Sequence, residues 1–298
     1  MSGEARAPRP LPDLPDDAHK GDAGRLLLVC GSEAMPGAAI FSARAAMRAG
    51  AGTVTLVAFG PTLAQALPAA VPEAMLLDLS KTRDLYAGRL PGPIVTRDDH
   101  ARLVGPGLGQ GGRTLTLVRT LVESTFAGGL ILDADGLTSL GTNVDLLAEH
   151  AGSLVITPHP GEARRLLGRE VSADAEDRRA AALELAKRSG GVCVLKGRRS
   201  VVANAEGREW TNDTGNSGMA TAGAGDVLAG IVAAYVGWLR SAGKKSDHDL
   251  FECVCAATRV HGLAGDLASR ARGRRGVIAS DIIEHLPLAQ RDWLSGAL

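Results

Sequence analysis

A glycine-rich stretch that ends in an acid is the part of the chain best suited to chemistry. It runs from Asn212 to Asp226 and contains four glycines, and the apolar residues 227–239 follow it directly. Glycines just before a helix allow backbone N–H groups to converge, and the helix N-terminus adds positive potential. The stretch therefore predicts an anion site, and phosphate is the anion we expect there.

Asp226, the last residue of this stretch, has two interpretations. A carboxylate at the start of a helix often only caps its free N–H groups. An acid beside a phosphate-binding loop would also repel its ligand, however. Its presence therefore favours a base that takes a proton from a hydroxyl group about to attack phosphorus.

Three further polar positions follow short apolar runs. Asp133 and Asp135 come after residues 130–132 and, on an extended segment, point the same way. They would either hold Mg²⁺ through water or satisfy N–H groups of a turn. Lys196 ends the run 192–195, and it either snorkels to solvent or places its charge near nucleotide phosphates.

His159 stands between two prolines directly after the apolar run 153–156. A lone histidine is usually structural, but the prolines hold this one stiffly at the predicted ligand end of a strand. We therefore expect it to contact substrate.

Residues 107–112 offer a competing motif, because they match G-x-G-x-x-G between a predicted strand and a predicted helix. Asp133 follows Gly112 at the distance of a ribose-binding acid. Taken alone, the motif predicts a Rossmann-type NAD-dependent dehydrogenase. It leaves the 212–226 stretch without a task, so this interpretation ranks second.

Short apolar runs and helical patterns alternate along the chain and would position these residues. Such alternation predicts an α/β fold with a mainly parallel sheet covered by helices on both faces. Ligands then bind beyond the carboxyl ends of the strands. The expected strands are residues 26–30, 53–58, 75–79, 102–104, 130–132, 153–156 and 192–195, and the expected helices are 37–49, 113–124, 142–149, 161–168 and 174–189.

The C-terminal part has a different pattern. A hairpin is expected over 200–204 and 208–211, and helices over 226–240, 248–270 and 279–286 close the domain. Residues 1–20 are proline-rich and predict a flexible tail. Residues 21–298 show no internal linker, which indicates a single domain.

Composition excludes several function classes. Thirty-three basic residues balance thirty-three acidic ones, and only 3% of residues are aromatic, which argues against nucleic acid as a partner. The longest apolar run is shorter than the roughly 20 residues of a membrane span, and no signal peptide is visible. The four cysteines form no ligand-like CxxC and are expected to be buried free thiols. These features indicate a cytoplasmic protein.

Several stretches, in order and at suitable spacing, resemble the NAD(P)H-hydrate dehydratases, which are members of the ribokinase-like superfamily. The resemblance implies a ribokinase-like α/β fold with a central, mainly parallel sheet flanked by helices. It covers about residues 19–232. The matching stretches are residues 19–32, 36–39, 48–52, 105–109, 132–137, 157–162, 196–197 and 216–230.

The resemblance also implies an activity in metabolite repair. The S epimer of NADH hydrate or NADPH hydrate would be dehydrated at the expense of ADP, or of ATP, and ADP would give AMP and phosphate. Asp226 would deprotonate the ring hydroxyl, and Mg²⁺, whose protein ligands stay unassigned, would neutralise charge. The hydrate would contact Ala38, Gly107, Gly109, His159 and Asp226, and the nucleotide would contact Lys196, Gly197, Arg198, Arg199, Ser200, Asn216, Gly223 and Gly225.

The sequence departs from the family pattern at two positions, and the resemblance also implies two partners. Ala224 replaces the usual threonine before Gly225-Asp226, and Met35 stands where an aromatic residue is common. A homo-oligomer, a tetramer, is expected, together with a separate epimerase, because only about 20 residues precede the matching region. A ribokinase-like kinase of a vitamin precursor, which would release a stable phosphorylated product, is the alternative within the superfamily.

Overall fold

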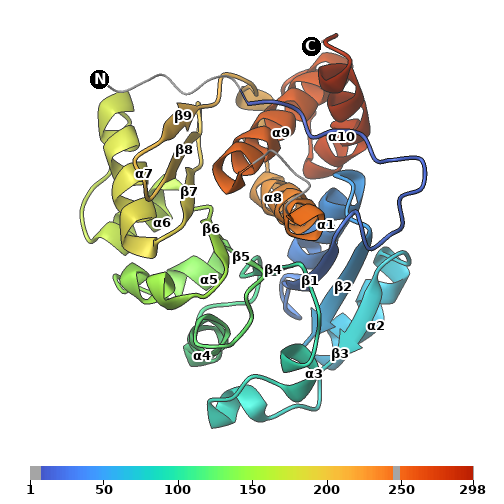
Figure 1. Ribbon diagram of the computed structural model, residues 1–298, viewed down its shortest axis with the longest axis vertical. Coiled ribbons are helices and arrows are strands. Elements are labelled where there is room, and N and C mark those ends of the chain that lie inside the picture. The colour runs from blue at the N-terminus through green and yellow to red at the C-terminus, as the bar shows by residue number, and fades with distance from the viewer. Residues whose placement is uncertain (1–7, 244–248, 298) are drawn as a thin grey trace.

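One twisted sheet organises the chain, and helices cover both of its faces (Figure 1). The computed structural model describes residues 8–243 and 249–297. The strand order is β3-β2-β1-β4-β5-β6-β7-β8-β9, parallel from β3 to β7 and antiparallel at β8 and β9. The strands are β1 (Arg25–Val29), β2 (Thr53–Ala58), β3 (Met75–Asp78), β4 (Ala101–Val104), β5 (Gly129–Leu132), β6 (Ser153–Ile156), β7 (Val192–Leu195), β8 (Val201–Asn204) and β9 (Glu209–Thr211).

Helices connect most of the parallel strands, as right-handed crossovers require. The α-helices are α1 (Pro36–Arg48), α2 (Pro61–Ala70), α3 (Gly92–Val95), α4 (Gly112–Val122), α5 (Asp135–Thr138), α6 (Pro160–Leu167), α7 (Ala175–Ser189), α8 (Ala224–Ala242), α9 (Leu250–Arg272) and α10 (Ala279–Leu294). Short 3₁₀ helices are η1 (Asp84–Ala87), η2 (Val144–Glu149) and η3 (Ser217–Met219).

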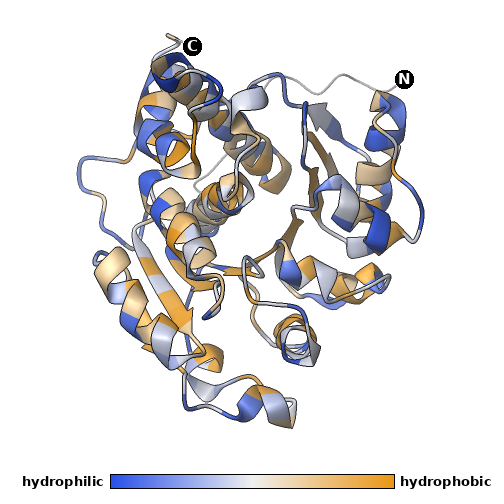
Figure 2. Cartoon of the chain, turned by 180° about the vertical axis from the view of Figure 1, so that it is seen from behind, coloured by the Kyte–Doolittle hydropathy of each residue, from blue (hydrophilic) through white to orange (hydrophobic). Residues whose placement is uncertain are grey.

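Side chains that alternate along each strand build two separate cores. Leu26 and Leu28 of β1 pack on the side of α1, α2, α8, α9 and α10. Leu27 and Val29 pack on the other side, which α4, α6 and α7 cover. The strands are therefore apolar on both faces, and Figure 2 shows them largely in the hydrophobic colour, whereas the helices mix both colours.

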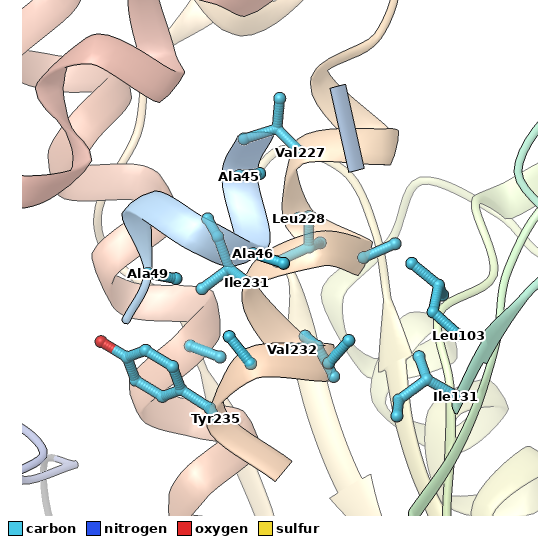
Figure 3. Close-up of a cluster of buried hydrophobic side chains, with 14 of the residues drawn as sticks. Ala45, Ala46, Ala49, Leu103, Ile131, Val227, Leu228, Ile231, Val232 and Tyr235 are labelled. Atoms are coloured by element: carbon cyan, nitrogen blue, oxygen red, sulfur yellow. The ribbon is translucent and has the colours of Figure 1, made fainter. Parts of the chain in front are cut away.

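The packing of α1 against α8 is unusually close because both helices present small residues. Ala45, Ala46 and Ala49 of α1 face Ile231 of α8 in the first core (Figure 3). At Gly230 a Cβ atom would lie 2.3 Å from the Ser42 carbonyl oxygen. The two backbones therefore touch, and α8 is held where its first turn carries Asp226.

Most predicted elements are confirmed, and two differ. The stretch predicted as a helix over 142–149 is instead the 3₁₀ helix η2. The last helix does not end at 286 but continues past Pro287 to Leu294, because Ala289 and Trp293 bury against the first core. Residue 248 of a predicted helix lies outside the described residues.

The helix α2 was absent from the sequence interpretation, and the structure places it beside β3. Its sequence, PTLAQALPAA, carries prolines at both ends, and only Leu63 and Leu67 are buried. Two buried residues give a weak helical pattern, which explains the omission.

The predicted tail has contacts where it is described. Leu11 packs against the first core, and Arg9 donates to a Glu252 carboxylate oxygen at 3.3 Å. In Figure 1 this dark-blue segment passes along α9 and α10. Residues 1–7 of the tail lie outside the described residues.

Two compositional expectations have structural counterparts. All four cysteines are buried and free, as predicted. None of the helices in the described residues has the length and apolar character needed to cross a membrane.

Gly230→Ala tests the contact between α1 and α8. The added methyl group must push the helices apart, so we expect the free energy of unfolding to fall by about 1–3 kcal/mol. Denaturant titration followed by circular dichroism measures it. Gly112→Ala is the matched control, since a Cβ there meets nothing within 4 Å; equal losses in both variants would contradict the close packing.

Candidate active site

The sheet has its switch point between β1 and β4. Helix α1, which follows β1, covers one face of the sheet, and helix α4, which follows β4, covers the opposite face. Gly31, just after β1, donates its N–H to the Pro106 carbonyl at 2.7 Å, which ties the two loops together. Ligands of doubly wound sheets bind at such a point.

Two of the predicted substrate residues meet at this switch point. At Gly107, whose φ is 64°, a Cβ atom would lie 2.7 Å from the Ala38 Cβ. Any side chain at position 107 would therefore collide with the start of α1. Gly109, with φ of 84°, donates its N–H to Asp135 at 2.8 Å, so an acid on α5 holds the end of this loop.

Lys196 is the cation of the site. Its Nζ lies 2.5 Å from Asp133 Oδ1 and 3.9 Å from Glu162 Oε2, and only 16% of its side chain is exposed. Burial lowers the Lys196 pKa, but the carboxylates of Asp133 and Glu162 outweigh burial and raise it overall. The side chain is therefore a charged internal partner rather than a snorkelling one.

The expectation that Asp133 and Asp135 point the same way is wrong. Ala134 between them adopts φ of 49° and ψ of −119°, and Asp135 already begins α5. The chain turns there, so Asp133 reaches Lys196 while Asp135 reaches Gly109. A non-glycine residue in this conformation is strained, and such strain gathers at functional sites.

His159 caps α6. Its Nδ1 accepts the N–H groups of Gly161 and Glu162, and its own N–H donates to Glu162 Oε2 at 2.8 Å. Burial and the nearby Lys196 ammonium lower the pKa of His159, which keeps the ring neutral near pH 7. More than half of its side chain is exposed beside the site, and its Nε2 lies 3.3 Å from Glu162 Oε1.

Glu162 was not among the predicted site residues, although it stands in the same motif. Its carboxylate is 5% exposed, and burial, opposed by Lys196, raises its pKa to about 7. The signal in the sequence was its spacing, three residues after the cap His159, which is the pattern of a capping box.

Asp226 occupies the first turn of α8. Burial raises its pKa to about 6; the carboxylates of Asp133 and Asp135 add to the rise, and Lys196 opposes it. Within the described residues no hydrogen bond reaches this carboxylate, and the N-cap position is Gly223. The capping interpretation is therefore unsupported, and the carboxylate is available to take a proton.

The glycine-rich loop is held from α9. Asp266 accepts the Gly215 N–H at 2.9 Å and the Asn216 side-chain amide at 2.7 Å. Asn216 in turn accepts the Gly218 N–H at 2.8 Å. Asp266 lies 50 residues from Asn216 along the chain, so no local pattern in the sequence pointed to it.

The remaining predicted nucleotide residues divide into two groups. At Gly225 a Cβ would lie 3.6 Å from Lys196 Nζ, which brings the loop and the acids together. Gly197, Arg198 and Arg199 form an exposed turn between β7 and β8. Ser200 donates within that turn to the Gly197 carbonyl at 3.1 Å.

The site residues could bind a divalent cation through water molecules, but not as its direct ligands. Asp133, Asp135, Glu162 and Asp226 outnumber Lys196, and a cation would offset that excess. In residues 8–243 and 249–297, however, no three acid, histidine or cysteine side chains converge as metal ligands. Any Mg²⁺ must therefore be held through water and ligand phosphates, which is its usual preference.

The fold and the site together define a ribokinase-like α/β protein, with a glycine loop and an acid at a helix start. Residues 26–288 match the family model described as NAD(P)H-hydrate dehydratase. The chain belongs to the NAD(P)H-hydrate dehydratase family, whose members are hydro-lyases.

Individual relatives agree with this family. The chain is 38% identical to the ADP-dependent (S)-NAD(P)H-hydrate dehydratase of Neisseria meningitidis, over 90% of this chain and 85% of that one. It is 37% identical to the bifunctional NAD(P)H-hydrate repair enzyme of Thermofilum pendens, over 97% of this chain and 54% of that one. The chain thus spans about half the length of such bifunctional relatives.

A solved structure shares the fold. The ADP/ATP-dependent NAD(P)H-hydrate dehydratase of Bacillus subtilis, co-crystallised with ATP and Mg²⁺, superposes with a TM-score of 0.81 at 27% identity, covering 95% of each chain. The family match also removes the dehydrogenase interpretation. Its ribose-binding acid, Asp133, is instead paired with Lys196.

Glu162→Gln tests the charge balance of the site through stability. The native pKa of about 7 lies above the ordinary 4.5, so between these values the native state binds more protons than the unfolded state. The free energy of unfolding then falls as pH rises through this window. In the wild type, we expect Glu162 to lower the free energy of unfolding by roughly 2 kcal/mol between pH 4.5 and 7.5, and we expect this decrease to be absent in Glu162→Gln.

Chemical denaturation at a series of pH values measures this difference. Glu206→Gln, in the exposed turn between β8 and β9, is the control and should leave the wild-type profile unchanged. A Glu162→Gln profile parallel to that of the wild type would mean that Glu162 is already ionised at low pH.

Proposed function

We propose that this chain dehydrates the S epimer of NADH hydrate or NADPH hydrate, with ADP as the preferred co-substrate, and so restores the reduced cofactor. The observation that carries the proposal is the Asp226 carboxylate at the start of α8, which accepts no hydrogen bond from the part of the chain that the structure describes, in a chain of this family. ADP is preferred because the Neisseria meningitidis relative is named ADP-dependent, while the Bacillus subtilis enzyme is named ADP/ATP-dependent.

Asp226 acts as the general base in the first step. Its carboxylate takes the proton of the ring hydroxyl, and the oxygen attacks the terminal phosphorus of ADP, whose bond to the bridging oxygen breaks to release AMP. A base works best when its pKa lies near the working pH, and a value of about 6 meets that condition.

The nucleotide lies along the glycine-rich loop. The N–H groups at the start of α8, near Gly223 and Gly225, would stabilise the developing phosphate charge, and the Lys196 ammonium would add a positive charge beside them. Asp266 supports this arrangement because it fixes Gly215 and Asn216. The exposed turn of Gly197, Arg198, Arg199 and Ser200 would contact the rest of the nucleotide.

The hydrate lies at the switch point between Ala38, Gly107, Gly109 and His159. The exposed face of the neutral His159 ring would contact the hydrate without a charge that would compete with the nucleotide. In the second step the ring nitrogen lone pair expels phosphate and the ring loses a proton, which restores the dihydropyridine. The acids around Lys196 would hold Mg²⁺ through water, and the ion would supply charge neutralisation for the phosphates.

Two partners belong to the same proposal. An epimerase must supply the S epimer, because a single fixed base serves only one orientation of the hydroxyl. A homo-oligomer, a tetramer, is the assembly that we expect. The exposed Met75 and Leu76 on the open edge strand β3 support self-association, since apolar edges favour pairing.

Asp226→Asn tests the base. The amide keeps the shape but takes no proton, so we expect kcat to fall by at least about 10²-fold while ADP still binds. Recovery of reduced-nicotinamide absorbance from NADH hydrate, ADP and Mg²⁺ measures turnover, and calorimetry measures ADP binding. Asp281→Asn is the matched control: Asp281 starts α10 but does accept a backbone N–H, from Ile278 at 2.9 Å. It should lose stability and keep turnover.

If Asp226→Asn still restores the reduced-nicotinamide absorbance at the wild-type rate, Asp226 is not the general base. A stable phosphorylated product from a vitamin-precursor alcohol, with no absorbance recovered from NADH hydrate, would instead indicate the vitamin-precursor kinase.

The pH profile gives an independent test. Asp226 must be ionised to act, so kcat/KM should fall below about pH 6. The Lys196 ammonium lowers the pKa of Asp226, so Lys196→Met should move this acid limb to higher pH as well as weaken activity. An acid limb that stays in place in Lys196→Met would show that another group controls it.

A further inference from the structure

A second concave site lies at the opposite edge of the sheet. A cavity of about 360 Å³ opens at the amino ends of β4 and β5. Arg240 of α8 lines it, and the 14 residue steps from Asp226 to Arg240 span about 21 Å of helix. The cavity is therefore separate from the candidate active site, and its size falls within the range of small-molecule sites.

The floor of the cavity is a buried charge network. Arg102 of β4, only 1% exposed, donates to Asp99 at 3.3 Å and to the Ile94 carbonyl at 3.0 Å, and its guanidinium lies 3.8 Å from the centre of the Phe126 ring. Arg97 also donates to Asp99, at 3.0 Å. One carboxylate, that of Asp99, thus accepts hydrogen bonds from two guanidinium groups, which form one wall of the cavity.

Two other residues that line the cavity, Arg240 and His100, carry N–H donors outside this charge network. Arg240 is exposed and donates to the Ala127 carbonyl at 2.7 Å. No carboxylate of residues 8–243 and 249–297 forms an ion pair with it in the structure. His100 accepts the Arg25 N–H on Nδ1 at 3.1 Å, which leaves its proton on Nε2.

The charges of the lining favour an anion. Three arginines, 97, 102 and 240, face two acids, Asp98 and Asp99. Asp98 forms an ion pair with Arg25 at 2.6 Å and has a side chain that is 93% exposed. Burial, and then the charge of Arg25, lower the pKa of His100, and the carboxylates of Asp98 and Asp99 oppose this shift.

We propose that this cavity binds a small oxyanion, a carboxylate or a phosphate, between the Arg240 guanidinium and the His100 Nε2–H. The buried Arg102–Asp99 network supplies a fixed wall, and Arg240 supplies the charge and a forked donor set. The activity of the protein requires no such ligand at this edge, so the site is additional to the proposed function.

Calorimetric titration of the whole chain with citrate, and separately with inorganic phosphate, tests the proposal. Saturating ADP is included to occupy the glycine-rich loop, and chloride keeps the ionic strength constant. We expect one equivalent of anion to bind, and Arg240→Ala to weaken its affinity at least about tenfold. Tight binding of only one probe would identify carboxylate or phosphate as the ligand chemistry.

Arg44→Ala is the matched control. Arg44 is also exposed and also donates to a backbone carbonyl, that of Ala70 at 2.9 Å, but it lies outside the cavity. His100→Asn is the second variant, because an amide can accept the Arg25 N–H yet lacks Nε2. It should weaken binding, whereas Arg44→Ala should not. No binding by the wild type, or equal binding by all three variants, would overturn the proposal.

Discussion

Several carboxylates are buried close together at the carboxyl ends of the strands, and this is possible only because the ammonium group of Lys196 lies among them. Asp133 arrives from the end of β5 and Glu162 from α6, and both face the same Nζ. Removing two or more charges from water is costly, and close pairing is what offsets that cost. The loop after β5, the cap of α6 and the end of β7 are therefore fixed relative to one another by a single cation.

That cation does not balance the site completely, and the remaining excess sets its acid–base character. Burial and the neighbouring carboxylates raise the pKa values of Asp226 and Glu162 to about 6 and 7. An exposed acid would be too weak a base for proton abstraction near neutral pH. The negative excess also explains why phosphate ligands would arrive with a metal ion, even though the described residues offer no direct metal cage.

The two edges of the sheet use a buried cation in opposite ways. At the carboxyl edge one Lys196 faces several acids, whereas at the amino edge one Asp99 faces Arg97 and Arg102. The first arrangement leaves carboxylates free for chemistry and the second leaves positive charge free for an anion. Helix α8 joins them, because its first turn carries Asp226 and its last turn carries Arg240.

The amino-acid sequence was sufficient to predict the α/β class, most strands, and the strand and helix ends at which Asp226, Lys196 and His159 stand, because apolar runs and the residues next to them are local signals. It did not determine that Ala134 turns Asp133 away from Asp135, that Glu162 joins Lys196, or that Asp266 holds Asn216. Those partners are brought together by the order of strands in the sheet and by helices distant in sequence. These contacts exist only in the folded chain, because spacing along the chain carries no information about which strand ends become neighbours.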